Sequence, residues 1–365
     1  HFTKYSVSLH HQLQLQQMEP KQTLLGMTLA EITESVTELN LPKFTAKQIA
    51  NWVYLKRVKT IDEMTNISLK NRELLTERFD VGRSEPLDIK TSVDGTRKML
   101  FKTAGGKFIE TVTIPEDDRL TICVSSQVGC RMNCDFCMTG KQGFQAQLSA
   151  GDIINQVLSI EESDQLSNLV YMGMGEPMDN LDQVLKSLQI LTSEWGMGWS
   201  PRRINVSTIG VIPAMRRFIE ESEAHLAISL HSPFDEERRR LMPIQQVYSI
   251  ENVVETLMEY DFGRQRRISF EYIMFDGLND TPNHVKGITK LLNGLRCRIN
   301  LIKFHSIPDS PLKGTSPERM QWFADQLNKK GITTTVRRSR GEDIYAACGL
   351  LSTKTLVKKE DNKDF

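Results

Sequence analysis

Short runs of β-forming residues alternate with helical patterns through the second two-thirds of the chain, and this alternation constrains the fold more than any other feature. Strand-helix alternation predicts parallel strands joined by right-handed crossovers. Six such units occupy about 230 residues, fewer than the ~250 typical of a closed eight-fold barrel. We therefore predict an open, partial (β/α)6 barrel over residues 119–352. The runs lie at 121–126, 168–174, 203–208, 225–231, 268–275 and 299–305, and a seventh at 332–339 is expected to add an edge strand.

Two smaller regions precede the predicted barrel. Residues 18–85 have helical periodicity and predict a small N-terminal all-α accessory domain. Residues 86–118 alternate between apolar and polar types around Gly-containing turns, and they predict a short antiparallel β extension. Helix-capping signals begin at Thr28, Thr45 and Thr60 in the first region and at Ser149 and Ser316 in the barrel.

The remaining segments and the composition set limits on location and partners. Residues 1–17 and 353–365 predict a disordered and a frayed tail. No window approaches the ~20 apolar residues of a membrane-spanning helix, and no secretory signal is evident, so we expect a cytoplasmic protein without a membrane partner. The 46 basic and 46 acidic residues cancel, which excludes a uniform coat of positive charge but allows local basic patches.

Three cysteines lie in one loop directly after the first predicted barrel strand. Cys130, Cys134 and Cys137 stand at the C-terminal end of that strand, where parallel barrels place their chemistry. Clustered thiolates select zinc or iron–sulfur. A closed zinc site needs a fourth ligand, for which Cys123 is the candidate; buried, unligated cysteines are a further alternative. Three ligands leave one metal position open, as an iron–sulfur cluster that binds its substrate directly requires.

Polar residues follow the next three predicted strands at the same end of the barrel. Gly175 and Glu176 follow the second strand, where a glycine permits close backbone approach and a carboxylate suits a cation. Ser207 ends the third strand, and Ser229, Leu230 and His231 end the fourth. Taken singly, each is more often a structural strand-end residue. Taken together with the cysteine loop, they predict a binding site for a nucleoside ligand.

The cysteine spacing, C-x3-C-x-F-C with Phe136 as the aromatic residue, resembles the signature of the radical S-adenosylmethionine (SAM) superfamily. The resemblance implies that Cys130, Cys134 and Cys137 hold a [4Fe–4S] cluster whose fourth iron is chelated by SAM. It also implies SAM contacts from the strand-end residues given above. Where many relatives carry Asn for a further SAM contact, this chain has His305.

The stretches QVGCRMNCDFCMTG, YMGMGEPMDN, INVSTIGVIP, AISLHSP and AACGLL resemble, over residues 21–350, the RNA adenosine methyltransferases of the RlmN/Cfr type. The resemblance implies methylation of adenosine C2 in 23S rRNA, in the peptidyl-transferase region, and in tRNA next to the anticodon, with two SAM molecules per turnover. Cys348 is then methylated by the first SAM, Cys123 resolves the protein–RNA adduct through a disulfide with Cys348, and Glu110 accepts a proton.

Several alternatives stay open at this point. Without the resemblance, Cys348 is more often a small buried apolar residue and Glu110 a solvated strand residue. Cys297 matches no functional position and is expected to be structural. A C8-directed enzyme of the Cfr type and a non-catalytic, zinc-stabilised RNA-binding protein are the alternative functions. An external electron donor such as flavodoxin and a monomeric state complete the expectations.

Five basic runs are available to hold RNA phosphates, balanced by acidic helices elsewhere. An adenosine in folded RNA must be flipped out of its stack to reach a buried site. We therefore predict salt-sensitive RNA binding through some of these runs, and because the first of them lies in residues 18–85, we expect that helical domain to be an RNA-binding accessory domain. The five runs are residues 56–59, 202–203, 238–240, 264–267 and 337–340.

Overall fold

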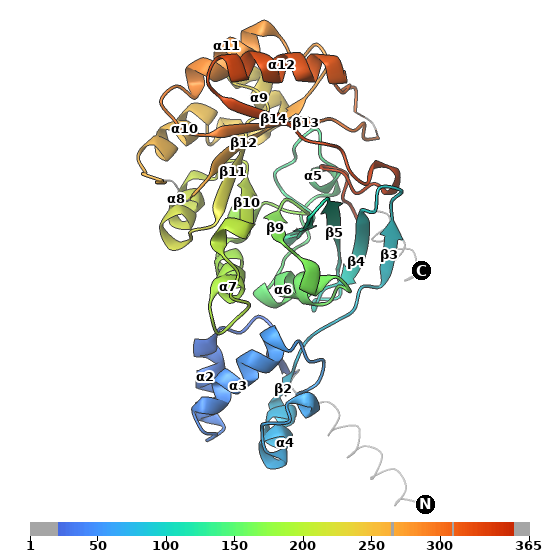
Figure 1. Ribbon diagram of the computed structural model, residues 1–365, viewed down its shortest axis with the longest axis vertical. Helices are drawn as coiled ribbons and strands as arrows, with labels where there is room; N and C mark the ends of the chain where they lie inside the picture. Colours follow the sequence, from blue (N-terminus) through green and yellow to red (C-terminus); the bar gives the residue numbers. More distant parts are fainter. Residues whose placement is uncertain (1–20, 264–265, 309, 354–365) are drawn as a thin grey trace, which may run out of the picture. The chain divides into compact units, whose positions relative to one another are not determined.

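The computed structural model describes residues 21–263, 266–308 and 310–353 (Figure 1). The chain divides into two compact units, one ending at Gly82 and the other beginning at Arg83. The predicted tail at 1–17, and all but Thr353 of the one at 353–365, lie outside the described residues. Within the described residues, no helix combines the length and apolar character needed to cross a membrane.

The N-terminal unit is helical, as predicted, but it also contains a short pair of strands. Its helices are α2 (Leu29–Glu38), α3 (Phe44–Ala50), η1 (Asn51–Leu55), η2 (Ile61–Glu63) and α4 (Leu69–Arg78). Strands β1 (Gln22–Thr23) and β2 (Phe79–Asp80) pair in parallel and join the two ends of the unit. The prediction of an all-α domain is therefore wrong in this detail, because a two-residue pairing carries no periodicity that a sequence pattern can reveal.

Two of the three capping signals in this unit are confirmed. Thr28 and Thr60 form complete capping boxes with the glutamates three residues later. Thr45 instead lies inside α3 and is buried. Its backbone N–H donates to the carbonyl of Pro42 at 2.8 Å, so the turn that starts this helix begins at the proline, whose fixed φ suits a first helical turn.

The second unit is built on one ten-stranded sheet in the order β14-β13-β12-β11-β10-β9-β6-β5-β4-β3. Seven neighbouring strands are parallel, which confirms the partial barrel and the added edge strand. They are β6 (Arg119–Cys123), β9 (Asn168–Tyr171), β10 (Ile204–Thr208), β11 (His225–Ser229), β12 (Ile268–Met274), β13 (Arg298–Lys303) and β14 (Thr333–Val336). All seven residues of β12 are buried, so this strand lies at the centre of the sheet's core.

The predicted β extension is confirmed as an antiparallel meander of β3 (Asp88–Thr91), β4 (Arg97–Lys102) and β5 (Phe108–Glu116). It continues the barrel sheet, because β5 pairs antiparallel with β6. A separate small hairpin joins β7 (Gln127–Val128) to β8 (Ala146–Gln147) on either side of the cysteine loop.

Helices cover the outer side of the parallel strands (Figure 1). Ser149 and Ser316 cap α6 and α12 through hydrogen bonds to backbone N–H groups, as predicted. The helices are α5 (Met138–Gln142), α6 (Ala150–Leu158), α7 (Leu181–Thr192), α8 (Ile212–Glu221), α9 (Asp235–Leu241), α10 (Ile250–Met258), α11 (Pro282–Leu291) and α12 (Pro317–Lys329).

Residues 337–353, here called the closing segment, run from the last parallel strand back to the β extension. The Asp343 carboxylate accepts hydrogen bonds from the Ser92 hydroxyl and from the backbone of Val93, at 2.5 and 3.2 Å. The backbone N–H of Gly341 donates to Asp94 at 2.9 Å. The segment therefore links the two ends of the sheet, and it carries Cys348.

Candidate active site

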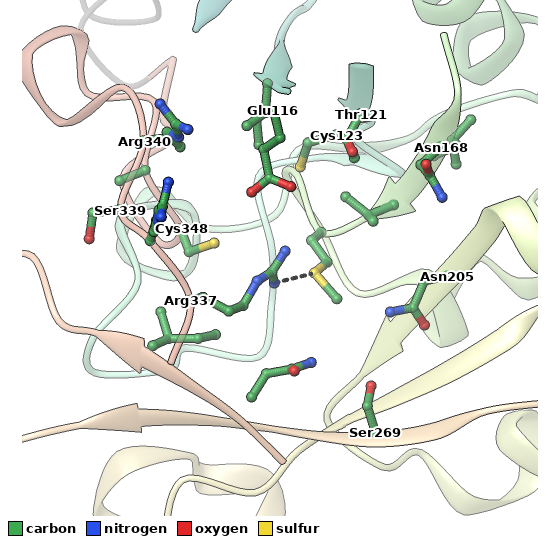
Figure 2. A pocket seen from close by; sticks show the side chains of 18 of the residues that line it. Glu116, Thr121, Cys123, Asn168, Asn205, Ser269, Arg337, Ser339, Arg340 and Cys348 are labelled. Atoms are coloured by element: carbon green, nitrogen blue, oxygen red, sulfur yellow. Dashed lines mark hydrogen bonds between the residues drawn. The ribbon is translucent and has the colours of Figure 1, made fainter. Parts of the chain in front are cut away.

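A cavity of about 730 Å³ lies inside the barrel, walled by inward-facing side chains of the parallel strands and by the closing segment. Polar side chains such as Asn168, Asn205 and Ser269 line it (Figure 2). Cys123, Cys137, His305 and Cys348, four of the residues singled out from the sequence, also line this cavity.

The cysteine loop occupies the C-terminal end of β6, as predicted. Cys130 and Cys134 are buried and Cys137 is half-buried. Burial raises the pKa of Cys130 to about 12 and that of Cys134 well above its ordinary value, and the neighbouring thiols of the loop raise both further. The three thiols are therefore close neighbours. The backbone N–H of Met138 donates to the carbonyl of Gly349 at 2.8 Å, which ties the loop to the closing segment.

These three thiols fit an iron–sulfur cluster better than a single zinc ion. Within the described part of the chain, no three His, Cys, Asp or Glu side chains are placed to hold one metal ion. The charges that act on the pKa of Cys123 come from Cys348 and Arg337 rather than from the cysteine loop. Cys123 therefore belongs with Cys348 rather than with the buried thiols of the loop. Three soft thiolates in one loop suit a cluster with one open iron.

The loop after β9 is shaped by Gly175 and Glu176. Gly175 has φ +103°, and a Cβ there would stand 2.5 Å from the Cβ of Gln127, so only glycine fits. The buried Glu176 carboxylate accepts hydrogen bonds from the Thr208 hydroxyl and from the backbone of Met178 and Ile209, at 2.5, 3.1 and 3.1 Å. It thereby holds the β9 loop against the end of β10. Burial raises its pKa to about 7 although these bonds oppose the shift.

The strand-end residues of β10 and β11 lie at the same end of the barrel. Ser207 and Ser229 are half-buried, whereas Leu230 and His231 are buried. His231 accepts a hydrogen bond from the backbone of Ile273 at 3.0 Å. Its ring meets that of Phe136, the aromatic residue of the cysteine motif, edge-on at 4.7 Å between centroids. His231 is therefore part of the packing that supports the cysteine loop.

Arg238 is a supporting residue that sequence reasoning assigned incorrectly. The basic run 238–240 predicts RNA contacts, but the Arg238 side chain is fully buried. It donates to the carbonyls of Ile209, Ser229 and Leu230, at 2.9, 3.0 and 3.1 Å. It therefore fastens the ends of β10 and β11 together. The neighbouring Arg239 pairs with Asp235 on the surface of α9. A run of charges in a sequence does not reveal which member points inward.

His305, which stands in the position of a family Asn, lies in the cavity wall and is buried. Its Nδ1 atom is 3.2 Å from Oε1 of Glu342, an exposed residue of the closing segment. No local sequence pattern indicates this contact, because His305 follows β13 and Glu342 lies on the closing segment.

Cys123 on β6 and Cys348 on the closing segment line the same cavity. Their thiols and the guanidinium group of Arg337 point into the same part of the cavity (Figure 2). Burial raises the pKa of Cys123 to about 12, the Cys348 charge adds to this, and Arg337 opposes it. The Cys348 side chain is exposed to solvent at the cavity, so it is not the small buried residue of the alternative interpretation. Desolvation raises its pKa, and Arg337 again lowers it. Arg337 is held 3.5 Å from the buried Glu271 and 3.7 Å from the sulfur of Met172.

Glu110 is buried, unlike a solvated strand residue. Its Oε1 atom pairs with Lys98 at 2.9 Å, and its Oε2 atom accepts from the backbone of Ser352 at 2.9 Å. It thus contacts the closing segment four residues after Cys348. Cys297 does not line this cavity: it precedes β13, and burial alone raises its pKa to about 12.

The partial barrel and its three-cysteine loop define a radical SAM enzyme, and residues 124–287 match the model of the radical SAM superfamily. Residues 22–81 match the model of the ribosomal RNA large subunit methyltransferase N-terminal domain. The chain belongs to the RlmN family of dual-specificity RNA methyltransferases.

Relatives at several distances support this assignment. A probable dual-specificity RNA methyltransferase RlmN of Phocaeicola vulgatus is 57% identical over 341 residues, covering 93% of this chain and 98% of the relative. The dual-specificity RNA methyltransferase RlmN of Syntrophus aciditrophicus is 40% identical, covering 91% and 97%. The crystal structure of a radical SAM methyltransferase from Sphaerobacter thermophilus has a TM-score of 0.85 at 38% identity, covering 90% of this chain and 99% of that one. These relatives favour the RlmN type over the C8-directed alternative.

Proposed function

We propose that this enzyme methylates C2 of adenosine in 23S rRNA, in the peptidyl-transferase region, and in tRNA next to the anticodon, through an S-methylcysteine at Cys348. The observation that carries the proposal is the meeting of Cys123, Cys348 and Arg337 in one cavity that Cys137 of the cysteine loop also lines. The names of the relatives, which describe dual-specificity RNA methyltransferases, support the two RNA substrates.

The cofactors follow from the same arrangement. Cys130, Cys134 and Cys137 would hold a [4Fe–4S] cluster, which when bound supplies the electron for reductive cleavage of SAM. We propose that two SAM molecules are used per turnover and that the strand-end residues bind SAM. For Gly175 and Glu176 the backbone is the proposed contact, because the Glu176 carboxylate already accepts three hydrogen bonds. Ser207, Ser229, Leu230, His231 and His305 complete the proposed SAM-binding set.

The cysteines act in two separate steps. In the first, the Cys348 thiolate attacks the methyl group of SAM, a sulfur–carbon bond forms, and the electron pair leaves with the sulfonium sulfur. Arg337 favours the thiolate by lowering the pKa of Cys348 against the effect of desolvation. In the last step, the Cys123 thiolate attacks the sulfur of Cys348 in the protein–RNA adduct and a disulfide forms. The bond between that sulfur and the methylene carbon of the base breaks, its electron pair goes to the carbon, and the carbon takes up a proton to become the methyl group of the released base.

Glu110 is the proposed proton acceptor for the intervening step. Its carboxylate lies on β5 and bonds the closing segment near Cys348, while Lys98 balances its charge. An external electron donor such as flavodoxin, a monomeric state and a cytoplasmic site of action complete the proposal.

The test uses the anaerobically prepared holoenzyme. We expect peptide mass analysis to find one methyl group on Cys348 after incubation with SAM alone. A Cys123→Ala variant should then accumulate a covalent RNA adduct after reduction with RNA present. Cys297→Ala is the matched control, because it removes a thiol outside the site, and it should complete turnover. Chromatography of digested RNA against 2-methyladenosine and 8-methyladenosine standards identifies the carbon. An unmethylated Cys348 would defeat the mechanism.

A further inference from the structure

A second cavity, of about 1000 Å³, opens at the N-terminal ends of the parallel strands, opposite the cysteine loop. The proposed function assigns no role to it. Four residues line both this cavity and the one that holds Cys123 and Cys348, so the two cavities share a wall. These residues are Arg202, His225, Arg267 and Arg298.

The arginines in that shared wall differ from their neighbours in how their side chains are bonded. Among the described residues, the exposed guanidinium groups of Arg202, Arg267 and Arg298 make no hydrogen bond or ion pair. By contrast, the side chain of Arg203 donates to the carbonyls of two residues that precede β9. Arg266 donates to carbonyls at the end of α8. In the predicted basic runs 202–203 and 264–267, Arg203 and Arg266 therefore bond to the protein itself, whereas Arg202 and Arg267 remain available to a ligand.

The free arginines concentrate positive charge. Burial lowers the pKa of His225 to about 4, and the charges of Arg267, Arg266, Arg202 and Arg298 lower it further. His225 is therefore neutral near pH 7 and accepts a hydrogen bond from the backbone of Arg267 at 3.0 Å.

Some negative charge also faces this group. Glu116, Asp117 and Asp118 line the first cavity, and Glu116 is already paired with Arg119 at 2.5 Å. Asp261 lines the second cavity, and its Oδ1 atom is already bonded by the backbone of Gly263 at 2.8 Å. Unpaired guanidinium groups beside a cavity are the arrangement that binds phosphate.

The strand register sets the distance from this group to the reaction site. Arg267 directly precedes β12, and Glu271, the partner of Arg337, follows four residues later on the same strand. Four residues of β-strand span about 13 Å. That is roughly the length of a nucleotide from its phosphate to the far edge of its base. If a nucleotide enters from the N-terminal ends of the strands with its base directed toward Cys348, its phosphate therefore lies next to these arginines.

Resting on the proposed function, we propose that Arg202, Arg267 and Arg298 form a phosphate-binding site for the RNA backbone beside the flipped adenosine. The RNA then enters the barrel from the end opposite the cysteine loop. A free nucleotide offers the same phosphate chemistry, and the experiment separates the two sources.

The test compares two double variants of the full-length holoenzyme. Arg267→Gln with Arg298→Gln removes two free charges, and Arg216→Gln with Arg217→Gln removes two surface charges that are ion-paired. Affinity for an RNA stem-loop containing the target adenosine is measured at several salt concentrations. We expect the first variant to bind about 10- to 100-fold more weakly, with a salt slope smaller by about one, since each phosphate contact contributes about 0.7 to 0.9. The control should stay within about twofold of the parent.

The RNA-free methylation of Cys348 by SAM is measured as well. Because this step needs no RNA, it tests the proposed function separately from the proposed phosphate-binding site. Both double variants should methylate Cys348 at the parent rate, which also shows that they fold. If the parent itself leaves Cys348 unmethylated, the proposed function fails. If the parent methylates Cys348 but the Arg267/Arg298 variant binds RNA with the affinity and salt slope of the control, the phosphate site is overturned. ATP binding that depends on these arginines while RNA binding does not would overturn it in favour of a free nucleotide.

Discussion

At the scale of single residues, Arg337 has the largest consequence for the chemistry, because it is the cation next to both Cys123 and Cys348. We predict that Arg337→Gln raises the pKa of the Cys348 thiol, so the pH profile of its RNA-free methylation shifts upward by about one unit. At pH values below the pKa of the thiol, the variant then methylates Cys348 about tenfold more slowly than the parent. Arg337→Lys should retain most of the rate. Rates are followed by peptide mass, with Arg216→Gln as the control, and an unshifted profile would refute the role.

Individual residues were also where sequence reasoning met its limits. The cysteine motif could be placed correctly because its spacing lies within one loop. The burial of Arg238 and Glu110 could not be predicted, since it depends on which way a side chain points in the folded chain. The pairing of His305 with Glu342 joins segments 37 positions apart, and no local pattern encodes it.

At the scale of elements, the fold was largely predictable because strand runs, capping boxes and Gly turns are local signals. The sequence patterns did not reveal which side chains hold the ends of neighbouring strands together. The buried Arg238 fastens β10 to β11 through three backbone carbonyls and the side-chain amide of Gln245. The β1–β2 pair escaped prediction for a similar reason, since its two strands come from opposite ends of the N-terminal unit.

Replacing Arg238 should therefore loosen the end of the barrel at which SAM is proposed to bind. We predict that Arg238→Met lowers the free energy of unfolding by about 2–4 kcal/mol, because several buried carbonyls lose their donor. Arg239→Met, which removes only a surface ion pair with Asp235, should cost less than about 1 kcal/mol. Urea unfolding monitors both variants, and equal midpoints would contradict the fastening role.

At the scale of the whole molecule, buried titratable groups make stability depend on pH in opposite directions. Burial lowers the pKa of His231 to about 3, so its contribution is present above pH 6.5 and is lost as pH falls toward 3. Burial raises the pKa of Glu176 to about 7, so its contribution is present below pH 4.5 and is lost as pH rises through 7.

The two effects can be separated by one substitution. His231→Asn removes the buried imidazole whose protonation destabilises the fold at low pH, and it keeps an acceptor for the backbone N–H of Ile273. We predict that the loss of unfolding free energy between pH 7 and pH 5 is smaller in this variant by about 2 kcal/mol. Urea unfolding at the two pH values measures it. Parallel losses in the parent and the variant would show that His231 does not contribute.

The closing segment has a consequence for when the enzyme becomes active during its synthesis. Cys348 is positioned by contacts such as that of Asp343 with Ser92, which joins residues 251 positions apart. Such long-range contacts form late, because the loop between them must close first. The cysteine loop and all the parallel strands precede the closing segment in the chain. A polypeptide still emerging from the ribosome therefore contains the proposed iron–sulfur ligands before it contains Cys348, the proposed methyl acceptor, so on the proposed mechanism it is inactive until the closing segment has been made.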